Sequence, residues 1–545
     1  MNKAKWVLFF LLAVLVAVPS YAVELTLGGF PSYFRIRPQF YKDATFVSAL
    51  SNAQAQALGF NDADDNIVFV DSRLRLTPQL VLSDAVTIRA QVDVMDNTIW
   101  GGTNNLLVRD VVYESLTPTD RFRGALLVAP VNGNVLFNGL FGAGNGFDSS
   151  PAVDEVQYFN VRMLHVDIVL PHNLGFIRAG RQPFDWGLGI LANGGWDPLS
   201  DLGFVIDRFL YLKSWPLLKG TFTFVFVSDR LRQGDNAFGF GGLENGSGDG
   251  YDGGAFALIY NQGPLTVGGY LFPYIHQTNF AADANLNRFT LWALLADYKT
   301  DRFRFVGEMQ EAQGNITGAQ SLGFASDTID IDASNLIFAV RGEVYPGFPV
   351  SIGAVEFGYA NGDNIDPAND GGAFQGNVVA FSAAYNVDNL LFKHIIPNIY
   401  GLENSVINAF YVRGWMTAKL MDHVTFTPQV LVAWNEETQA LVQPNSPLFP
   451  PGNNEVDRFL GAELEGTLSI EVVTGVNFDF IGSVVVPGSG LKDLFEQRAA
   501  IECNTDVGPP GGSGGCAAIS GGFDAPSVPF AFQGRLLVYI DQFFK

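Results

Sequence analysis

Apolar and polar side chains alternate one by one along many short segments of this chain, and this alternation limits the folds it can adopt. Phe34, Ile36 and Phe40 fall on one face of an extended segment, and Arg35 and Arg37 fall on the other. The same alternation returns at residues 73–80 and 86–93. Because successive side chains of a β-strand point to opposite faces, we interpret these segments as two-faced strands.

High hydrophobicity accompanies the alternation. The chain is 48% hydrophobic and 13% aromatic, yet no stretch after residue 23 offers the roughly 18 consecutive apolar residues of a membrane-spanning helix. The richest stretch, 468–486, is interrupted by Glu471, Asn477 and Asp479. A bilayer admits only helices and closed barrels, because every backbone polar group needs a partner. We therefore predict an all-β fold, a transmembrane antiparallel up-and-down β-barrel.

The predicted strands are joined by connections that alternate in length. Short turns at 83–84, 171–173, 262–264, 300–301, 345–347 and 419–422 alternate with long polar stretches. This pattern predicts short periplasmic turns and long extracellular loops. With both termini periplasmic the strand number is even, so we expect about 18–20 strands. Including a segment at 390–397 gives 20, and 18 is the alternative. After residues 34–41, 73–80 and 86–93, the other segments predicted as strands are 156–169, 174–182, 205–213, 220–229, 253–262, 265–277, 287–299, 302–313, 333–346, 349–361, 376–386, 405–418, 423–435, 457–471, 473–487 and 530–541.

The two ends of the chain carry further signals. Lys3 and Lys5 precede an apolar run at 6–18, and small residues follow up to Ala22. This order predicts a signal peptide at 1–22 and a single barrel domain at 23–545. A retained membrane helix is the weaker alternative, because the apolar run is shorter than the roughly 20 residues that span a bilayer.

The last eleven residues, 535–545, place Leu536, Val538 and Ile540 on one face of a final strand. A chain that ends this way after a secretory signal resembles the outer-membrane β-barrel proteins of Gram-negative bacteria, although it ends in Lys545 where that family usually has Phe. The resemblance implies an integral protein of the cell outer membrane, with outer-membrane lipid and lipopolysaccharide as its surroundings. It does not indicate an oligomeric state.

The net charge of −23 argues against nucleic acid as a partner. Much of this charge lies in stretches such as 62–65, 327–332 and 362–370, which we interpret as solvated exterior loops. Binding of divalent cations there is the alternative, but the spacing does not predict a metal site.

Cys503 and Cys516 are the two cysteines of the chain. An even count in a secreted protein predicts a disulfide between them, which would contribute roughly 3 kcal/mol in the chain-entropy model. There is no Cys-x-x-Cys-His motif, and we predict no cofactor.

Arginines gather on the polar faces of the strands that should meet where the barrel closes. In a large barrel these faces line the lumen, so the pattern predicts a basic lumenal wall made of Arg35, Arg37, Arg73, Arg75, Arg89 and Arg535. Two interpretations remain open. The arginines could form a bracing charge network with Asp71, Asp93 and Asp541, or a ladder that guides anions. Inward carboxylates at Glu308, Glu343, Glu463 and Glu465 would add a transverse field.

The segment from Arg178 to Ala192, which includes Gly180-Arg181-Gln182, resembles the Gly-Arg-Gln segment of alginate-export-type and related porin-like barrels. In those barrels a strand ends in an inward-turned loop, and the resemblance implies a conduit with a basic lumen for an acidic polymer or another anion. A glycine pattern at 187–192 also fits a loose dinucleotide fingerprint, but no βαβ unit surrounds it. The longest connection, 96–155, could either fold into the lumen or form an exterior cap.

These features predict a porin-like channel for the passive passage of small solutes, with anions or an acidic polymer as its favoured cargo. We do not predict an enzyme, because the five histidines form no metal-spaced pair and no Gly-x-Ser-x-Gly elbow is present. The alternatives are a structural barrel, either an adhesin or the sheath of an electron-conduit complex, and a membrane-embedded hydrolase. No plug-sized domain precedes residue 34, which argues against a TonB-dependent receptor.

Overall fold

The structure is a computed structural model that describes residues 24–27, 30–44, 66–99, 159–201, 203–233, 250–278, 286–317, 328–362, 381–382, 384–396, 406–438, 456–495 and 528–543. The predicted signal peptide at 1–22, the predicted disulfide between Cys503 and Cys516, and residues 100–155 of the longest connection lie outside these ranges. Those predictions remain as stated.

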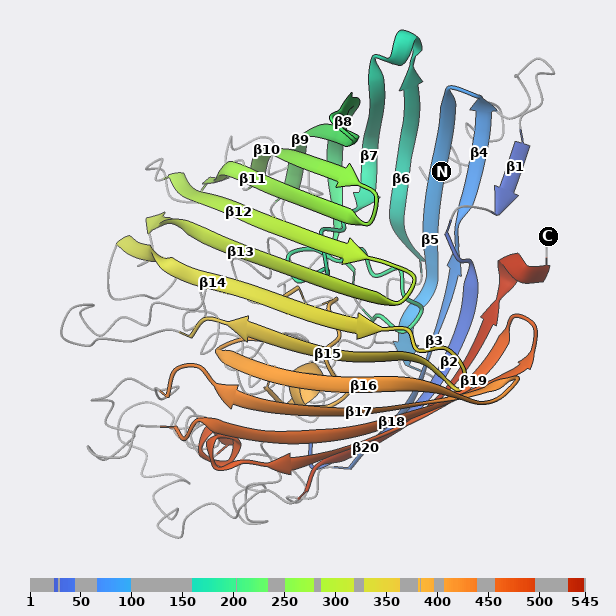
Figure 1. The fold of residues 1–545 in the computed structure, drawn as a ribbon, viewed down its shortest axis with the longest axis vertical. Coiled ribbons are helices and arrows are strands. Elements are labelled where there is room, and N and C mark those ends of the chain that lie inside the picture. Colours follow the sequence, from blue (N-terminus) through green and yellow to red (C-terminus); the bar gives the residue numbers. More distant parts are fainter. Residues whose placement is uncertain are drawn as a thin grey trace, which may run out of the picture.

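Most of the described chain is β-strand, and every pair of neighbouring strands is antiparallel (Figure 1). The strand segments are β1 (Glu24–Leu27), β2 (Tyr33–Lys42), β3 (Asn66–Leu76), β4 (Pro78–Ser83), β5 (Val86–Ile99), β6 (Phe159–Leu170), β7 (Gly175–Pro183), β8 (Val205–Leu217), β9 (Gly220–Gln233), β10 (Gly250–Gln262), β11 (Leu265–Thr278), β12 (Leu286–Lys299), β13 (Phe303–Thr317), β14 (Thr328–Val344), β15 (Val350–Ala360), β16 (Ala409–Met421), β17 (Val424–Asn435), β18 (Phe459–Val473), β19 (Val476–Pro487) and β20 (Phe530–Tyr539). The helical pieces are short: η2 (Pro171–Asn173), η5 (Leu391–Ile395), η7 (Ile540–Phe543) and an α-helical stretch at 489–495.

The strands close into a barrel. β20 pairs with β19 on one edge and with β2 on the other, so the last strand meets the first. β1 pairs with β4 while β2 pairs with β3, and β5 pairs with both β3 and β4. β1 with β2, and β3 with β4, are therefore two halves of single wall strands, and the described wall contains 18 strands. The prediction of an all-β up-and-down barrel is confirmed.

The wall has 18 strands, the lower of the two predicted counts, because two segments predicted as strands are not part of it. Residues 381–382 and 384–386, from the predicted strand 376–386, form no strand. The segment predicted at 390–397 contains instead the π-helical turn η5, whose five residues are all buried. Both segments are apolar because they pack inside the barrel, and period-two patterning cannot distinguish that burial from a strand face.

The two rims of the barrel differ as the sequence predicts. Hairpins such as β12–β13 and β18–β19 turn within a few residues, whereas the connections at the opposite rim are long. Tyr33, at the start of β2, lies opposite Tyr539 at the end of β20. The first and last strands therefore begin and end at the rim of short turns.

The outer face of the barrel is apolar. Leu294, Phe305 and Val355 are 49%, 56% and 60% exposed, while their inward neighbours Ala293 and Glu356 are fully buried. An apolar outer face with closed backbone pairing is the architecture of a transmembrane β-barrel. In the part of the chain that the structure describes, no helix is both long and apolar enough to cross a membrane.

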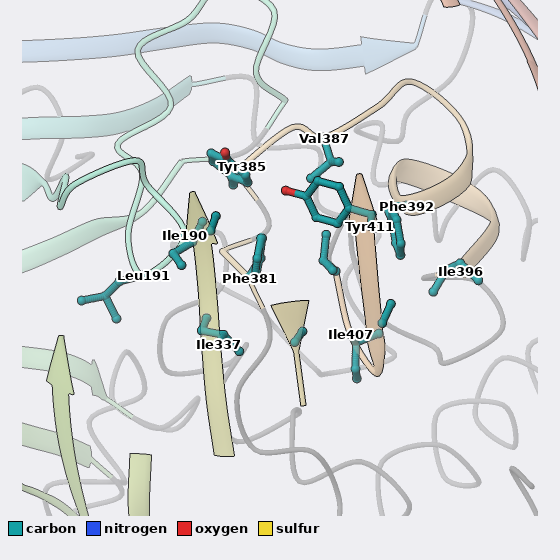
Figure 2. Close-up of a cluster of buried hydrophobic side chains, with 14 of the residues drawn as sticks. Ile190, Leu191, Ile337, Phe381, Tyr385, Val387, Phe392, Ile396, Ile407 and Tyr411 are labelled. Atoms are coloured by element: carbon teal, nitrogen blue, oxygen red, sulfur yellow. The ribbon is translucent and has the colours of Figure 1, made fainter. Parts of the chain in front are cut away.

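The hydrophobic core lies inside the barrel, in contrast to the expectation of a polar interior throughout. Figure 2 shows Ile190 and Phe381 packed among side chains of the wall, including Ile337 from β14 and Tyr411 from β16. The inward faces of β10 to β14 carry small or apolar residues such as Ala257. Two segments of the chain enter the barrel and supply the apolar partners for this side of the wall.

Candidate functional site

The first segment inside the barrel follows β7 and comprises the described residues 184–201 and 203–204; we call it the inner loop. Its contacts reach opposite walls. The backbone N–H groups of Gly189, Ile190 and Leu191 donate to the Glu308 carboxylate of β13 at 2.9, 3.3 and 2.9 Å. At its other end, Asp201 accepts from arginines of β2. A loop that touches both β13 and β2 on their inner faces crosses the lumen.

Close packing fixes the course of the inner loop. Gly187 has a φ of +55°, which favours glycine, and a Cβ there would lie 2.6 Å from Glu308 Oε2. A Cβ on Gly203 would lie 2.0 Å from Nη2 of Arg162. Asp185 accepts from the Gly194 N–H at 2.7 Å and from the Trp196 indole N–H at 2.5 Å, which fixes the middle of the loop.

The second segment lies before β16 and spans residues 384–396; we call it the inner segment. Arg413 donates to the Asn386 and Val387 carbonyls at 3.1 and 2.5 Å. Glu463 of β18 accepts from the N–H groups of Asn389 and Leu391 at 3.2 and 2.7 Å. The wall thus binds the backbone of the inner segment through one cation and one carboxylate, as it binds the inner loop through Glu308.

An arginine cluster on β2, β3 and β6 binds the far end of the inner loop. Arg35 and Arg37 both pair with Asp71, at 3.4 and 2.9 Å. Arg75 forms a two-pronged pair with Asp93, both bonds at 2.7 Å, and Arg162 lies 3.9 Å from the same carboxylate. All of these side chains are buried.

The same arginines donate to backbone carbonyls of the inner loop. Arg35 bonds the Pro198 carbonyl at 2.8 Å, and Arg73 bonds the carbonyls of Ser200 and Asp201, each at 2.8 Å. Arg75 bonds the Gly195 carbonyl at 2.8 Å and Arg162 the Gly194 carbonyl at 2.7 Å. The arginine cluster is therefore defined by Arg35, Arg37, Arg73, Arg75 and Arg162.

Asp201 connects the two inner elements. Its carboxylate lies 3.2 Å from Arg35 Nη2, 2.6 Å from Arg37 Nη2 and 3.2 Å from Lys393 Nζ of the inner segment. Burial alone would raise the pKa of Asp201, but Arg37, Lys393 and Arg35 hold it well below its usual range. This carboxylate is therefore ionised at every physiological pH.

A buried polar chain continues from the cluster to the inner segment. The Gln39 side chain donates to Asp71 at 2.6 Å, and the Tyr41 hydroxyl donates to Oε1 of Gln39. The Tyr41 oxygen lies 3.1 Å from Nε2 of His394. Burial, and next the charge of Lys393, hold the pKa of His394 well below its usual value, so this histidine is neutral.

The six arginines predicted for the lumen all lie on inward faces. Four of them belong to the arginine cluster, and the other two pair with carboxylates outside it. Arg35, Arg37, Arg73 and Arg75 belong to the arginine cluster and contact the inner loop. Arg535 pairs with Asp479 at 2.9 Å. Asp541, one of the carboxylates predicted for a bracing network, lies in η7. Arg89 pairs with Asp167 at 3.1 Å and its side chain is 26% exposed.

Sequence reasoning missed Arg162, Arg178, Asp201 and Lys393. Arg162 falls at a β-bulge where β5 and β6 shift register between Gln91 and Val92, and the extra residue turns its side chain inward. Arg178 is half-buried and bonds Asp167 at 2.6 and 3.0 Å. Its place in the Gly-Arg-Gln segment was the available signal.

Within that segment, neighbouring side chains point to opposite faces of the barrel wall. Gln182 points inward and is buried, whereas Arg181 points outward and pairs with Asp207 at 2.8 Å. Two of the predicted inward carboxylates, Glu308 of β13 and Glu463 of β18, are buried inside the barrel. In the described ranges no group of three or more His, Cys, Asp or Glu residues could hold a metal ion.

No protein-family model matches this chain, and no curated protein does. Among solved structures, the chain is similar to OccK9 (OpdG) of Pseudomonas aeruginosa, with 8% identity, a TM-score of 0.43, and coverage of 94% of this chain and 99% of that one. OccAB1 of Acinetobacter baumannii gives 9% identity, a TM-score of 0.43 and coverage of 93% and 95%. OmpT, an outer membrane protein of Vibrio cholerae, gives 9% identity, a TM-score of 0.32 and coverage of 95% and 99%.

Proposed function

We propose that the protein is a channel of the bacterial outer membrane that passes small solutes passively and prefers anions. The observation that carries the proposal is the closed 18-strand barrel with an apolar outer face and a basic inner wall. Large barrels of this kind enclose aqueous lumens. On this proposal the short turns and both chain ends lie in the periplasm.

The inner elements favour small solutes over a polymer. The inner loop crosses the lumen and meets the inner segment at Asp201 and Lys393. Together they narrow the route that a solute would take. The loop after Gly180-Arg181-Gln182 is consistent with the resemblance to alginate-export-type barrels, but its place across the lumen favours a compact anion as cargo. The same occupation of the interior disfavours a sheath around a haem protein.

Conductance of the purified protein in a planar lipid bilayer tests the channel. We expect stepwise currents, and a reversal potential in a KCl gradient that indicates anion preference. A protein that inserts and stays silent would contradict the proposal.

Two arginines of β7 give a matched pair of variants for the ion preference. Arg178→Ala removes an inward guanidinium whose side chain is 28% exposed, and should shift the reversal potential toward cations. Arg181→Ala removes an outward one, 47% exposed, and should leave the potential unchanged. Equal shifts in the two variants would contradict a lumenal role for the inward charge.

A further inference from the structure

The arginine cluster brings several positive charges close together inside the barrel. Arg35 lies directly opposite Arg73 across β2 and β3, with both side chains inward and buried. Like charges directly opposite each other destabilise a ladder, and buried charges need partners. The described wall offers this cluster two carboxylates, Asp71 and Asp93.

The inner loop supplies further acceptors to the cluster. It brings one carboxylate, Asp201, and the carbonyl oxygens of Gly194, Gly195, Pro198, Ser200 and Asp201. Among the described residues, three carboxylates and these loop carbonyls accept from the arginine cluster and Lys393. A carbonyl is a weaker acceptor for guanidinium than a carboxylate or phosphate, which binds two parallel N–H groups.

We propose that the arginine cluster is a binding site for oxyanionic solutes, and that the inner loop occupies this site when no solute is bound. The Asp201 carboxylate and the loop carbonyls then stand where the oxygens of the solute would lie. This inference rests on the proposed anion channel and names the site that its cargo would occupy.

The geometry of the loop allows such an exchange. Its anchor on β13, through the N–H groups of Gly189 to Leu191, is separate from its contacts with the arginines at residues 194–201. The second stretch can leave the cluster while the first stays bound to Glu308. Because the loop is covalently attached, it competes with a solute at a high effective concentration.

Isothermal titration calorimetry on the purified protein in detergent tests the site, with inorganic phosphate and succinate as the probes. Asp201→Asn removes the competing charge and keeps the shape, so it should bind a probe about tenfold more tightly than the wild type. Asp197→Asn is the matched control. It removes one charge from the same loop, but Asp197 is exposed and its carboxylate accepts from the Leu199 N–H.

Two further variants test whether the gain in affinity depends on the arginine cluster and on the position of Asp201. Arg73→Gln combined with Asp201→Asn should lose the gain in affinity, because Arg73 belongs to the site. Lys393→Gln loosens Asp201 without changing an arginine and should give a smaller gain in the same direction. Equal affinity in Asp201→Asn, Lys393→Gln and Asp197→Asn would overturn the proposal.

The two probes separate the chemical sources of the oxyanion. Tighter binding of phosphate indicates phosphorylated solutes, and tighter binding of succinate indicates carboxylic acids. Conductance of the same variants separates this inference from the proposed function. Binding without any current would refute the channel and leave the site standing, whereas current without the gain in affinity would refute the site.

Discussion

At the scale of single residues, the inside of this barrel brings titratable groups into unusual surroundings, and Asp388 is the clearest case. It lies buried in the inner segment, where its carboxylate accepts from the N–H groups of Phe392 and Lys393 at 2.9 to 3.1 Å. Burial raises the pKa of Asp388 to about 7, and the neighbouring Glu465 acts in the same direction.

This pKa predicts that the folded protein loses stability as the pH rises. Between about pH 4 and pH 7 the folded state holds a proton on Asp388 that the unfolded state releases, so the free energy of unfolding falls across this window. The loss should be on the order of a few kcal/mol. Thermal unfolding followed by near-UV circular dichroism at pH 5 and pH 8 should show a smaller difference in Asp388→Asn than in the wild type. The same pH dependence in both proteins would contradict the prediction.

Residue-scale prediction from the sequence succeeded where strict alternation held. The inward positions of Arg35, Arg73 and Arg535 follow from parity alone. Alternation failed at Arg162, where a β-bulge adds a residue. Alternation could not predict the ion pair of Lys393 with Asp201, because Lys393 lies in a segment that is not a strand.

At the scale of elements, the inner loop depends on a single wall carboxylate. Glu308 accepts from three backbone N–H groups of the loop, and both sides of this contact are buried. Each donor left without a partner would cost about 1–3 kcal/mol. The loop should therefore leave β13 when Glu308 is removed.

Glu308→Ala should raise the single-channel conductance in a planar bilayer, because a detached loop narrows the lumen less. Glu343→Ala is the control. It removes an inward carboxylate of β14 that contacts Arg304, Arg341 and the Tyr345 hydroxyl rather than the loop. Unchanged conductance in Glu308→Ala, with the protein folded, would show that the inner loop does not restrict the route.

The elements of the wall were largely predictable, and the elements inside it were not. Strands with one lipid face and one lumenal face carry a strong period of two, as in β2 and β17. The inner segment carries apolar residues on all sides because it is enclosed by the wall, so it resembled a strand in the sequence. Its true contacts, such as Arg413 to Val387, join residues that no local pattern connects.

At the scale of the whole molecule, the apolar outer face sets the stability of the barrel in a membrane. Leu294→Arg places a charge near the middle of β12, where Leu294 is 49% exposed on the outer face. It should cost about 2–4 kcal/mol if this position lies near the bilayer midplane. Urea unfolding from lipid vesicles measures the loss, with Leu294→Met as the control. A cost equal in the two variants would mean that this face does not meet hydrocarbon.

The barrel architecture was predictable because lipid imposes one rule on every strand. The structure inside the barrel was not predictable, because it depends on contacts between a loop and wall strands that lie far apart in the sequence. The fifteen residues around Gly180-Arg181-Gln182 gave the one hint of an inward turn, and the structure shows that turn at 184–204.

The inner loop also has a consequence for the order of assembly. Its two anchors join residues that are far apart in the chain, Asp201 with Arg35 and Leu191 with Glu308. The seam between the first and last strands carries Arg35 and Arg37, which contact this loop. Pairing of neighbouring hairpins does not by itself form these contacts. Folding in the bilayer should end with a slow concerted step in which β2 pairs with β20 and the inner loop forms its contacts with the wall.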